Sequence, residues 1–562
     1  MHHFILHNYV EMLDGHMLIC RYLFFYNYDL LIGLNRKEHL KFNYSKIEIR
    51  NMSFQIKNML LNKSVVYNLL ANYGTTISGS LLSLLFTPLY IYYLSIEAYG
   101  VIGFIASLMV FLNFMDLGIG QTVNREMAKF HRDNTQVNYL NNLVFSLQTV
   151  YITIGILCSL IVIIAAPFLG TKWFNAESLS THTITYAIII LGITIACRWP
   201  YSFFSSALRG MQFQVLLNSN EIFWNIVKSV GSLIVLKYFS GTLITFLWYQ
   251  CVVILCQTLS SMFLCWRFIE KPTISRRFDF SILKALSGYI ASMGIASIMV
   301  AFIFQLDKII LSNTLGGQEY GYYVLSNNLA TTLFILSTPV YISLFPHFTA
   351  FLHERKTDEL QKEFHKYTKI LSVTLLPIFC MLCYFTPELL WVWTKNQSII
   401  DHTTKLVRIM LIGTVLDAYM VVPNALLLSA SKTKFILITH TIALVIMVPL
   451  VYFLSIHFGA TGGAISVAII LGSYFVFEAP FVFKFFLPGH YTKWLWNDIF
   501  KIALPLIVLV TILRLILPNQ WILNRTLSFA ILCIIGITLQ ILAIKFSGLT
   551  FFEKYIFWKR RG

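Results

Sequence analysis

Basic side chains inside long apolar runs are the residues of this sequence whose type and position most clearly point to chemistry. Arg198, Lys228 and Lys308 lie within such runs, and Arg125 and Arg209 lie nearer to their ends. A cation in apolar surroundings is costly unless it is paired or lines a wet cavity, where it can hold phosphate or carboxylate. For Arg198 and Lys228 both an anion-binding cavity and a structural ion pair remain open. Arg125 and Arg209 fit better as side chains that reach out to the polar surface.

Acidic residues in or near the same runs are candidates for exchanging a proton or a sodium ion. They are Asp116, Glu221, Asp307 and Asp417. Asp307 directly precedes Lys308, and Glu221 lies seven residues before Lys228, on a similar face of a helix. Such pairing would prevent an acid from exchanging an ion, so ion coupling and structural pairing both remain open. Glu478 is expected close to the end of its run and is given no role.

Motifs of enzymes are missing from the sequence. It contains no P-loop, no H-E-x-x-H and no G-x-S-x-G, and its histidines show no metal-ligand spacing. Cys380 and Cys383 form a C-x-x-C inside an apolar run, where helix packing explains them better than redox chemistry. We therefore expect a protein that is not an enzyme, with no cofactor, no metal ion and no ATP-driven step within this chain.

The composition sets the fold class. Hydrophobic residues make up 57% of the chain and charged residues 12%, which is more apolar than a soluble core requires. In hydrocarbon the backbone must satisfy its own hydrogen bonds, which only helices and closed barrels can do. The runs lack the alternation of apolar and polar residues that barrel strands show, so helices are expected. We predict an all-α polytopic membrane protein. About fourteen runs of about 20 residues can each cross about 30 Å of hydrocarbon: 66–93, 100–117, 143–168, 184–204, 216–236, 242–265, 285–311, 322–345, 370–393, 406–429, 435–456, 461–483, 499–517 and 523–545.

The distribution of Lys and Arg predicts the orientation, because basic residues are retained on the cytoplasmic side. One set of alternate connections is basic, with Arg125, Arg276 and Lys356 among its residues, and the C-terminal Lys559 joins this set. The connections after the first, seventh and eleventh runs carry no Lys or Arg. Both termini are therefore predicted to be cytoplasmic. This topology explains the net charge of +17 without a nucleic-acid partner.

An internal repeat predicts the domain organisation. At an offset of about 221 residues the segment 94–100 falls on 315–321, and Gly241 falls on Gly462. These matches indicate two six-helix lobes of the same orientation, a parallel repeat. We predict a poorly ordered extension at 1–55, with Met52 as an alternative start. The first lobe is then 56–275, the second is 276–490, and two further helices with a basic tail form 491–562.

Several motifs resemble a known family. They are YIYYLSIEAYG at 90–100, FMDLGIG at 114–120, REMA at 125–128, LDKIIL at 306–311 and YGYY at 320–323. Over residues of about 60–550 the chain resembles the polysaccharide-transport family, the O-antigen and capsule repeat-unit flippases of the multidrug/oligosaccharidyl-lipid/polysaccharide exporter superfamily. Lipid II flippases of that superfamily carry arginines in the first helix, and 66–93 has none, which argues against a peptidoglycan precursor.

The resemblance implies a function. Two lobes in a V would move an undecaprenyl-diphosphate-linked oligosaccharide across the bacterial inner membrane by alternating access, with Arg198, Lys228 and Lys308 holding the diphosphate or acidic sugars. Expected partners are this lipid-linked oligosaccharide, membrane lipids, H⁺ or Na⁺, and polysaccharide polymerase machinery. Two alternatives remain. A multidrug exporter of the same superfamily would favour an acidic cavity, and an O-antigen polymerase would usually need a large extramembrane loop.

Overall fold

A computed structural model describes residues 63–114, 119–130, 136–272, 275–430, 432–517 and 525–548. Within these ranges the elements are helices and none is a strand, which confirms the predicted all-α class. The predicted extension at 1–55 and the basic tail with Lys559 lie outside the described residues.

The first half of the chain forms long helices joined by short connections. They are α3 (Lys63–Leu94), α4 (Ile96–Phe114), α5 (Ile119–Phe130), α6 (Val137–Phe168), η2 (Leu169–Trp173), α7 (Thr181–Gly210), α8 (Gln214–Tyr238) and α9 (Leu243–Phe268). Ser180 and Thr242 cap the starts of α7 and α9, because their hydroxyls accept the backbone N–H groups of Thr183 (3.1 Å) and Thr245 (3.3 Å).

The second half of the chain begins with α10 and ends with α21. Its elements are α10 (Phe280–Thr314), α11 (Gly317–Thr331), α12 (Leu333–His353), α13 (Thr357–Tyr384), α14 (Thr386–Thr394), α15 (Gln397–Tyr419), α16 (Val421–Ser429), α17 (Thr433–Ser473), η3 (Tyr474–Glu478), α18 (Ala479–Phe486), α19 (Tyr491–Lys493), η4 (Trp494–Phe500), α20 (Lys501–Ile516) and α21 (Arg525–Phe546). Asp279 caps α10, and hydrogen bonds from Ser281 hold the pKa of that carboxyl below its usual value.

The element α17 contains two helices. They join at Gly459, whose φ of 57° and ψ of −142° lie in a region that favours glycine. The Ser466 hydroxyl donates to the Leu450 carbonyl (3.2 Å), so the two halves lie side by side as a hairpin. The separate runs predicted at 435–456 and 461–483 correspond to these halves.

Helices long enough to span a membrane occur in both halves of the chain. Among the described residues, nine helical stretches are long and apolar enough to cross a membrane. Many of their large apolar side chains point outward, such as Ile164 at 78% and Leu515 at 82% exposure, which suits contact with lipid. The chain is thus a multi-pass membrane protein, while the count of fourteen spans remains a prediction.

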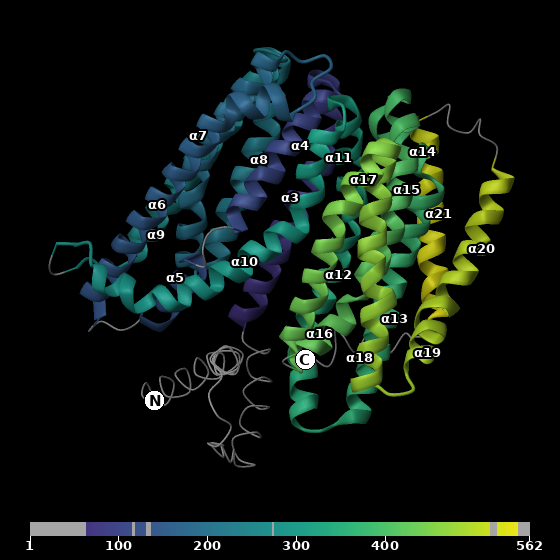
Figure 1. The fold of residues 1–562 in the computed structure, drawn as a ribbon. Coiled ribbons are helices and arrows are strands. Elements are labelled where there is room, and N and C mark those ends of the chain that lie inside the picture. Colours follow the sequence, from purple (N-terminus) through teal and green to yellow (C-terminus); the bar gives the residue numbers. More distant parts are fainter. Residues whose placement is uncertain are drawn as a thin grey trace.

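The helices form two groups that meet at one end. Figure 1 shows α6, α7, α8 and α9 on one side and α13, α15 and α17 on the other. The groups approach each other at the upper end of the view, where α4 and α11 lie side by side, and diverge toward the lower end. The helix α10 runs obliquely between them and packs against both α4 and α17. The predicted boundaries at 275 and 490 remain predictions.

Glycines allow the close approach of α4 and α11. A Cβ atom added at Gly100 would lie 3.0 Å from the Gly317 carbonyl oxygen and 3.0 Å from the Gly321 nitrogen. A Cβ atom at Gly321 would collide with the carbonyl of Ile96. Small residues let helix backbones come this close. Gly100 and Gly321 are the equivalent residues of the sequence repeat, so the repeat brings its own two copies into contact.

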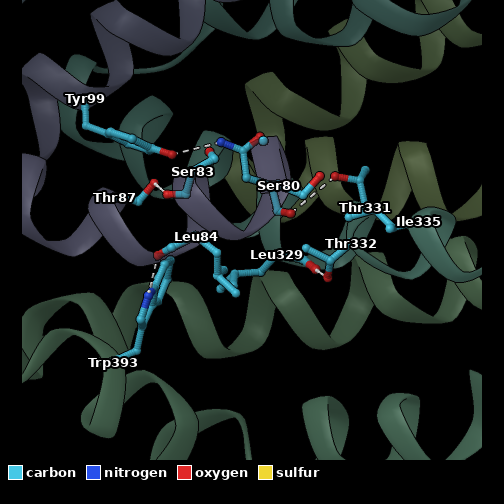
Figure 2. Close-up of a pocket in the computed structure, with 12 residues that line it drawn as sticks. Ser80, Ser83, Leu84, Thr87, Tyr99, Leu329, Thr331, Thr332, Ile335 and Trp393 are labelled. Carbon is cyan, nitrogen blue, oxygen red and sulfur yellow. Dashed lines mark hydrogen bonds between the residues drawn. The ribbon is translucent and has the colours of Figure 1, made fainter. Parts of the chain in front are cut away.

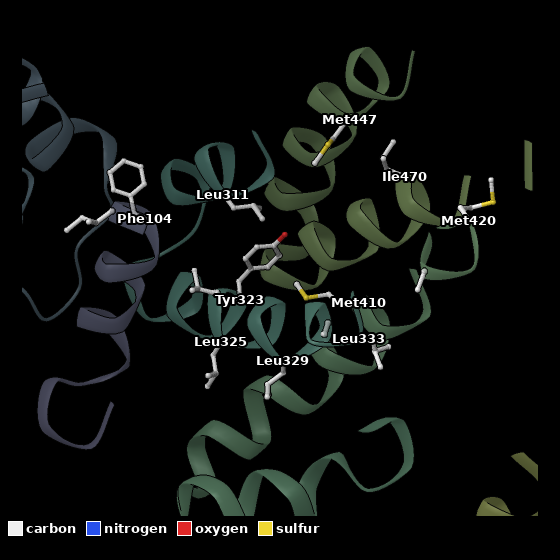
Figure 3. Packing of buried hydrophobic residues seen from close by; sticks show 14 of the residues in the cluster. Phe104, Leu311, Tyr323, Leu325, Leu329, Leu333, Met410, Met420, Met447 and Ile470 are labelled. Atoms are coloured by element: carbon white, nitrogen blue, oxygen red, sulfur yellow. The ribbon is translucent and has the colours of Figure 1, made fainter. Parts of the chain in front are cut away.

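The buried core continues from one group into the other. Figure 3 shows Phe104 of α4, Leu311 of α10, Tyr323 of α11 and Met410 of α15 in this cluster. Each of these four side chains is at most 1% exposed. Because lipid is as apolar as leucine, close packing and not hydrophobicity alone holds such helices together.

The two C-terminal helices form their own contact with the second group. A separate buried cluster, with Leu376 of α13, Leu506 of α20 and Leu539 of α21, joins them. Glu388 of α14 is fully buried and forms an ion pair with Arg514 of α20. Removing one partner of a buried pair is strongly destabilising, so this pair fixes α20 to the second group.

The glycine contact predicts the effect of a single methyl group. We expect Gly321→Ala to force α4 and α11 apart and to lower the thermal unfolding midpoint in detergent, because overpacking costs about 1–3 kcal/mol. Gly74→Ala in α3 is the matched control, since nothing lies within 4 Å of a Cβ there. Its midpoint should be unchanged or higher, because alanine favours a helix over glycine. An unchanged midpoint for Gly321→Ala would contradict the close approach.

Candidate functional site

A polar cluster joins α7 to α8 in the first group of helices. The Tyr201 hydroxyl donates to the Glu221 carboxylate, and Arg209 faces the same carboxylate at 3.8 Å. The sequence suggested Lys228 as the partner of Glu221, and the structure gives Arg209 and Tyr201 instead. The reason is distance, since seven residues cover about 10.5 Å along a helix axis. Glu221 is therefore paired, and Arg209 is half-exposed at the end of α7.

Arg198 lies beside this cluster and contacts neutral groups. Its guanidinium lies over the Tyr201 ring, 4.5 Å from the centroid, and donates to the Gln257 side-chain oxygen of α9 (3.1 Å). These contacts orient the side chain without cancelling its charge. Among the described residues, no carboxylate forms an ion pair with Arg198.

Lys228 brings a second positive charge into the same region. It is partly buried on α8, and it lies close enough to Arg198 for their like charges to repel each other. The described part of the chain offers Lys228 neither a hydrogen bond nor an ion pair. Two neighbouring cations without a carboxylate partner form a place where an anion would be stabilised.

The other predicted cations are paired. Arg125 of α5 forms an ion pair with Glu126 (2.6 Å). Lys308 lies 3.4 Å from the adjacent Asp307, and the Tyr323 hydroxyl donates to the other oxygen of Asp307 (2.8 Å). Asp307 is 3% exposed, so this arrangement has the features of a structural pair. Asp116 lies outside the described residues.

Two acids meet in the second group of helices. Asp417 of α15 interacts electrostatically with Glu478 and with Tyr474 of η3. Glu478 is 1% exposed, and neither of its carboxylate oxygens nor the Tyr474 hydroxyl has a hydrogen-bond partner in the described structure. His440 stacks on the Tyr474 ring, with centroids 4.7 Å apart. Glu478 was expected near a helix end, but the helix continues through α18 and buries it.

The acid pair is suited to a bound proton or a small cation. Repulsion between two neighbouring carboxylates falls when a positive charge lies between them. The nearby Thr439 hydroxyl donates to the Ile436 carbonyl (3.0 Å), and the His440 ring nitrogen faces the same carbonyl (2.9 Å). In the described ranges no group of three or more His, Cys, Asp or Glu side chains is arranged to hold a metal ion.

A hydrogen-bond network secures the end where the two groups meet, and we call it the closed end. It comprises α4, α11, residues 173–179 and residues 312–317. The Trp173 indole donates to the Ser312 hydroxyl (3.0 Å), and the Gly317 N–H donates to the Asn175 carbonyl (2.8 Å). Asn175 also donates to the Asn313 carbonyl (2.6 Å). These bonds connect the α6–α7 connection of one group to the α10–α11 connection of the other.

Glu97, which is not among the acids predicted from the sequence, organises one side of the closed end. Its buried carboxylate accepts the backbone N–H groups of Glu177 (2.7 Å), Ser178 (2.8 Å) and Leu179 (3.1 Å). Glu319 has a comparable role, because it accepts the Ala460 N–H (2.6 Å) of the α17 hairpin. Both acids stand in the repeated segments, just before Tyr99-Gly100 and Tyr320-Gly321. That recurrence was the signal available in the sequence.

Comparisons with known proteins give consistent similarities. A family model described as "Polysaccharide biosynthesis protein" matches residues 62–352, and one described as "MatE" matches residues 292–453. A Shigella flexneri protein named "Putative O-antigen transporter" is 21% identical over 380 residues, which cover 66% of this chain and 86% of that protein.

Solved structures share the fold. A lipid II flippase MurJ in an inward closed conformation aligns with a TM-score of 0.63 at 13% identity, over 88% of this chain and 99% of that one. A multidrug resistance MATE transporter in an inward-facing conformation aligns with a TM-score of 0.60 at 14% identity, over 73% and 94% of the two chains. At these identities the likeness concerns the fold alone.

The Glu97 network predicts a large effect from a nearly isosteric change. We expect Glu97→Gln to lower the free energy of unfolding by about 1.5–3 kcal/mol, because hydrogen bonds to a charged acceptor are lost from a buried site. The thermal midpoint of the purified protein measures the change. Glu177→Gln is the control, since that side chain is exposed. Equal midpoints for the two variants would refute the role given to Glu97.

Proposed function

Because this chain belongs to the polysaccharide biosynthesis protein family, whose model matches residues 62–352, we propose that it is a flippase for a lipid-linked oligosaccharide. The substrate is a repeat unit of O-antigen, capsule or exopolysaccharide, linked to undecaprenyl diphosphate. It crosses the inner membrane from the cytoplasmic to the periplasmic leaflet. The name of the Shigella relative and the fold shared with MurJ and MATE structures support this class of transport.

The observation that carries the proposal is the pair of uncompensated cations, Arg198 and Lys228. A diphosphate head group cannot cross hydrocarbon without counter-charges. Arg198 is already oriented by Gln257 and by the Tyr201 ring, so little side-chain freedom is lost when it binds an anion. Lys228 adds a second charge, and an anion between the two relieves their mutual repulsion.

Alternating access follows from the arrangement of the two groups. In this proposal the closed end faces the periplasm and the diverging end faces the cytoplasm, as the distribution of Lys and Arg predicts. Opening the closed end requires the α4–α11 contact and the Asn175–Gly317 bond to separate. The two groups then rock about the bound substrate.

Ion coupling is assigned to Asp417 and Glu478. In the described ranges neither acid forms an ion pair, in contrast to Glu221 and Asp307 of the pairs described above. Binding of a proton or Na⁺ there changes the packing between α15 and η3, because it removes the repulsion between the two acids. Coupling needs such a difference in affinity between the two conformations of the transporter.

A multidrug exporter is the second candidate function, and the same acid pair favours it. Carboxylates attract cationic drugs, and the model named MatE matches 292–453. Drug sensitivity of a deletion strain distinguishes the candidates, because a flippase for lipid-linked sugars would leave it unchanged.

Deletion of the gene in its native host tests the proposed function. We expect loss of surface polysaccharide, with undecaprenyl-linked repeat units accumulating in the cytoplasmic leaflet of inverted membrane vesicles. Accumulation in the periplasmic leaflet would instead indicate a polymerase. Normal polysaccharide would contradict the proposal.

The cation pair predicts a loss of transport. Arg198→Gln and Lys228→Gln should each reduce the rate of flipping in proteoliposomes by about tenfold or more, because one charge-assisted hydrogen bond contributes about 1.5–3 kcal/mol. Lys237→Gln is the matched control, since Lys237 is exposed at the end of the same helix, α8. Full activity of both cavity variants would exclude the diphosphate role.

The acid pair predicts a loss of coupling. Asp417→Asn and Glu478→Gln should abolish the stimulation of flipping by an imposed proton or sodium gradient, because neither amide can bind and release the ion. Asp401→Asn serves as the control, since Asp401 is exposed on the same helix as Asp417. Gradient stimulation that survives in both pair variants would place coupling elsewhere.

A further inference from the structure

A pocket of about 360 Å³ lies between the two groups of helices (Figure 2). One wall comes from α3 and α4, and the other comes from α11, α12 and α14. Its size is within the roughly 300–1,000 Å³ of small-molecule sites. The pocket adjoins the closed end, because Tyr99 and Asn328 line it and the Asn328 amide donates to the Tyr99 hydroxyl (2.8 Å).

The lining of the pocket is polar and uncharged. Hydroxyl groups come from Ser80, Ser83 and Thr87 on one wall and from Thr331 and Thr332 on the other. No Asp, Glu, Lys, Arg or His is among the lining residues. An anion or a cation would therefore lose its hydration without gaining a counter-charge, which is costly. A neutral ligand rich in hydroxyl groups meets no such penalty.

Several lining groups are available for hydrogen bonds to a ligand. In the described structure the Ser80 and Ser83 hydroxyls have no hydrogen-bond partner. The Asn328 side-chain oxygen also accepts no hydrogen bond there, although its amide is fixed by Tyr99. In contrast, Thr87 and Thr331 donate to the carbonyls of Ser83 and Asn327 (both 2.8 Å), so their oxygens remain as acceptors.

An aromatic side chain completes the pocket. The Trp393 indole N–H of α14 donates to the Leu84 carbonyl of α3 (2.8 Å), as Figure 2 shows. This bond uses the polar edge of the indole and holds the ring across the boundary between the two groups. The rest of the ring contributes apolar lining. A rigid aromatic ring among alcohols and an amide matches the chemistry of a sugar, which has apolar C–H groups and polar hydroxyls.

We propose that this pocket binds a neutral sugar of the lipid-linked oligosaccharide. The proposal rests on the proposed function and assigns two parts of the substrate to two different sites. Arg198 and Lys228 hold the diphosphate, while the pocket takes an uncharged sugar ring and excludes a carboxylated one. The substrate class is thus a repeat unit that contains at least one neutral sugar.

The position of the pocket gives the sugar a second role. Its walls belong to helices that must separate when the closed end opens. A sugar that hydrogen-bonds to Ser80 and Ser83 on one wall and to Asn328 on the other contacts both groups at once. Its presence or release therefore changes the balance between the two conformations.

The test uses two ligands that differ only in the oligosaccharide. Full-length protein in nanodiscs is titrated with undecaprenyl diphosphate and with the undecaprenyl-diphosphate-linked repeat unit extracted from the deletion strain. The pocket variant is the double change Ser80→Ala and Ser83→Ala, which removes two hydroxyls that have no partner in the described structure and so should fold normally. The control is Ser78→Ala on the same helix, whose hydroxyl bonds only to the Thr75 carbonyl.

We expect the pocket variant to bind the repeat unit about tenfold more weakly and undecaprenyl diphosphate unchanged. Arg198→Gln should weaken both ligands. Equal binding of the repeat unit by the pocket variant and the parent would overturn the pocket proposal while leaving the flippase standing. A repeat unit made only of acidic sugars would also overturn it. If the parent protein bound neither ligand, the proposed function itself would fail.

Discussion

The contact between α4 and α11 is the constraint on which the rest of the structure depends. Two backbones approach until a single Cβ at Gly321 would collide with the Ile96 carbonyl. Such an approach needs glycine. It is reinforced by Glu97, whose carboxylate accepts hydrogen bonds from three backbone N–H groups. Because both helices begin at this point, the contact fixes how the two groups are oriented. The pocket lined by Tyr99 of α4 and Asn328 of α11 lies beside this contact.

Charged side chains without an ion-pair partner occur in both groups. The first group contains Arg198 and Lys228 without carboxylate partners, whereas the second contains Asp417 and Glu478 without basic partners in the described ranges. In the proposed mechanism the cations serve the anionic substrate and the acids serve the coupling ion. Separate sites avoid mutual neutralisation, since a direct Arg198–Asp417 pair would cancel both. The link between the two sites is then the relative position of the groups, set at the closed end.

Local properties of the sequence determined the fold class and the repeat. Long apolar runs with few charges require membrane helices, because a backbone exposed to lipid must form all its hydrogen bonds internally. The recurring segment at 94–100 and 315–321 identified two equivalent connections, and these are the segments that meet in space. Arg198 and Lys228 could be selected from the sequence as candidate residues, because a cation inside an apolar run is unusual whatever its tertiary surroundings.

Pairing was decided by the tertiary structure alone. Glu221 of α8 is paired with Arg209 because the end of α7 lies beside α8. Asp307 of α10 accepts a hydrogen bond from Tyr323 of α11. Asp417 and Glu478 are 61 positions apart in the sequence and meet only through the packing of α15 against α17 and η3. Glu97 and the pocket lined by Ser80 and Asn328 were likewise hidden, because in both cases the residues that come together lie far apart in the sequence. A sequence shows which charged side chains lie inside apolar runs. The distances between packed helices determine which of these charges neutralise one another.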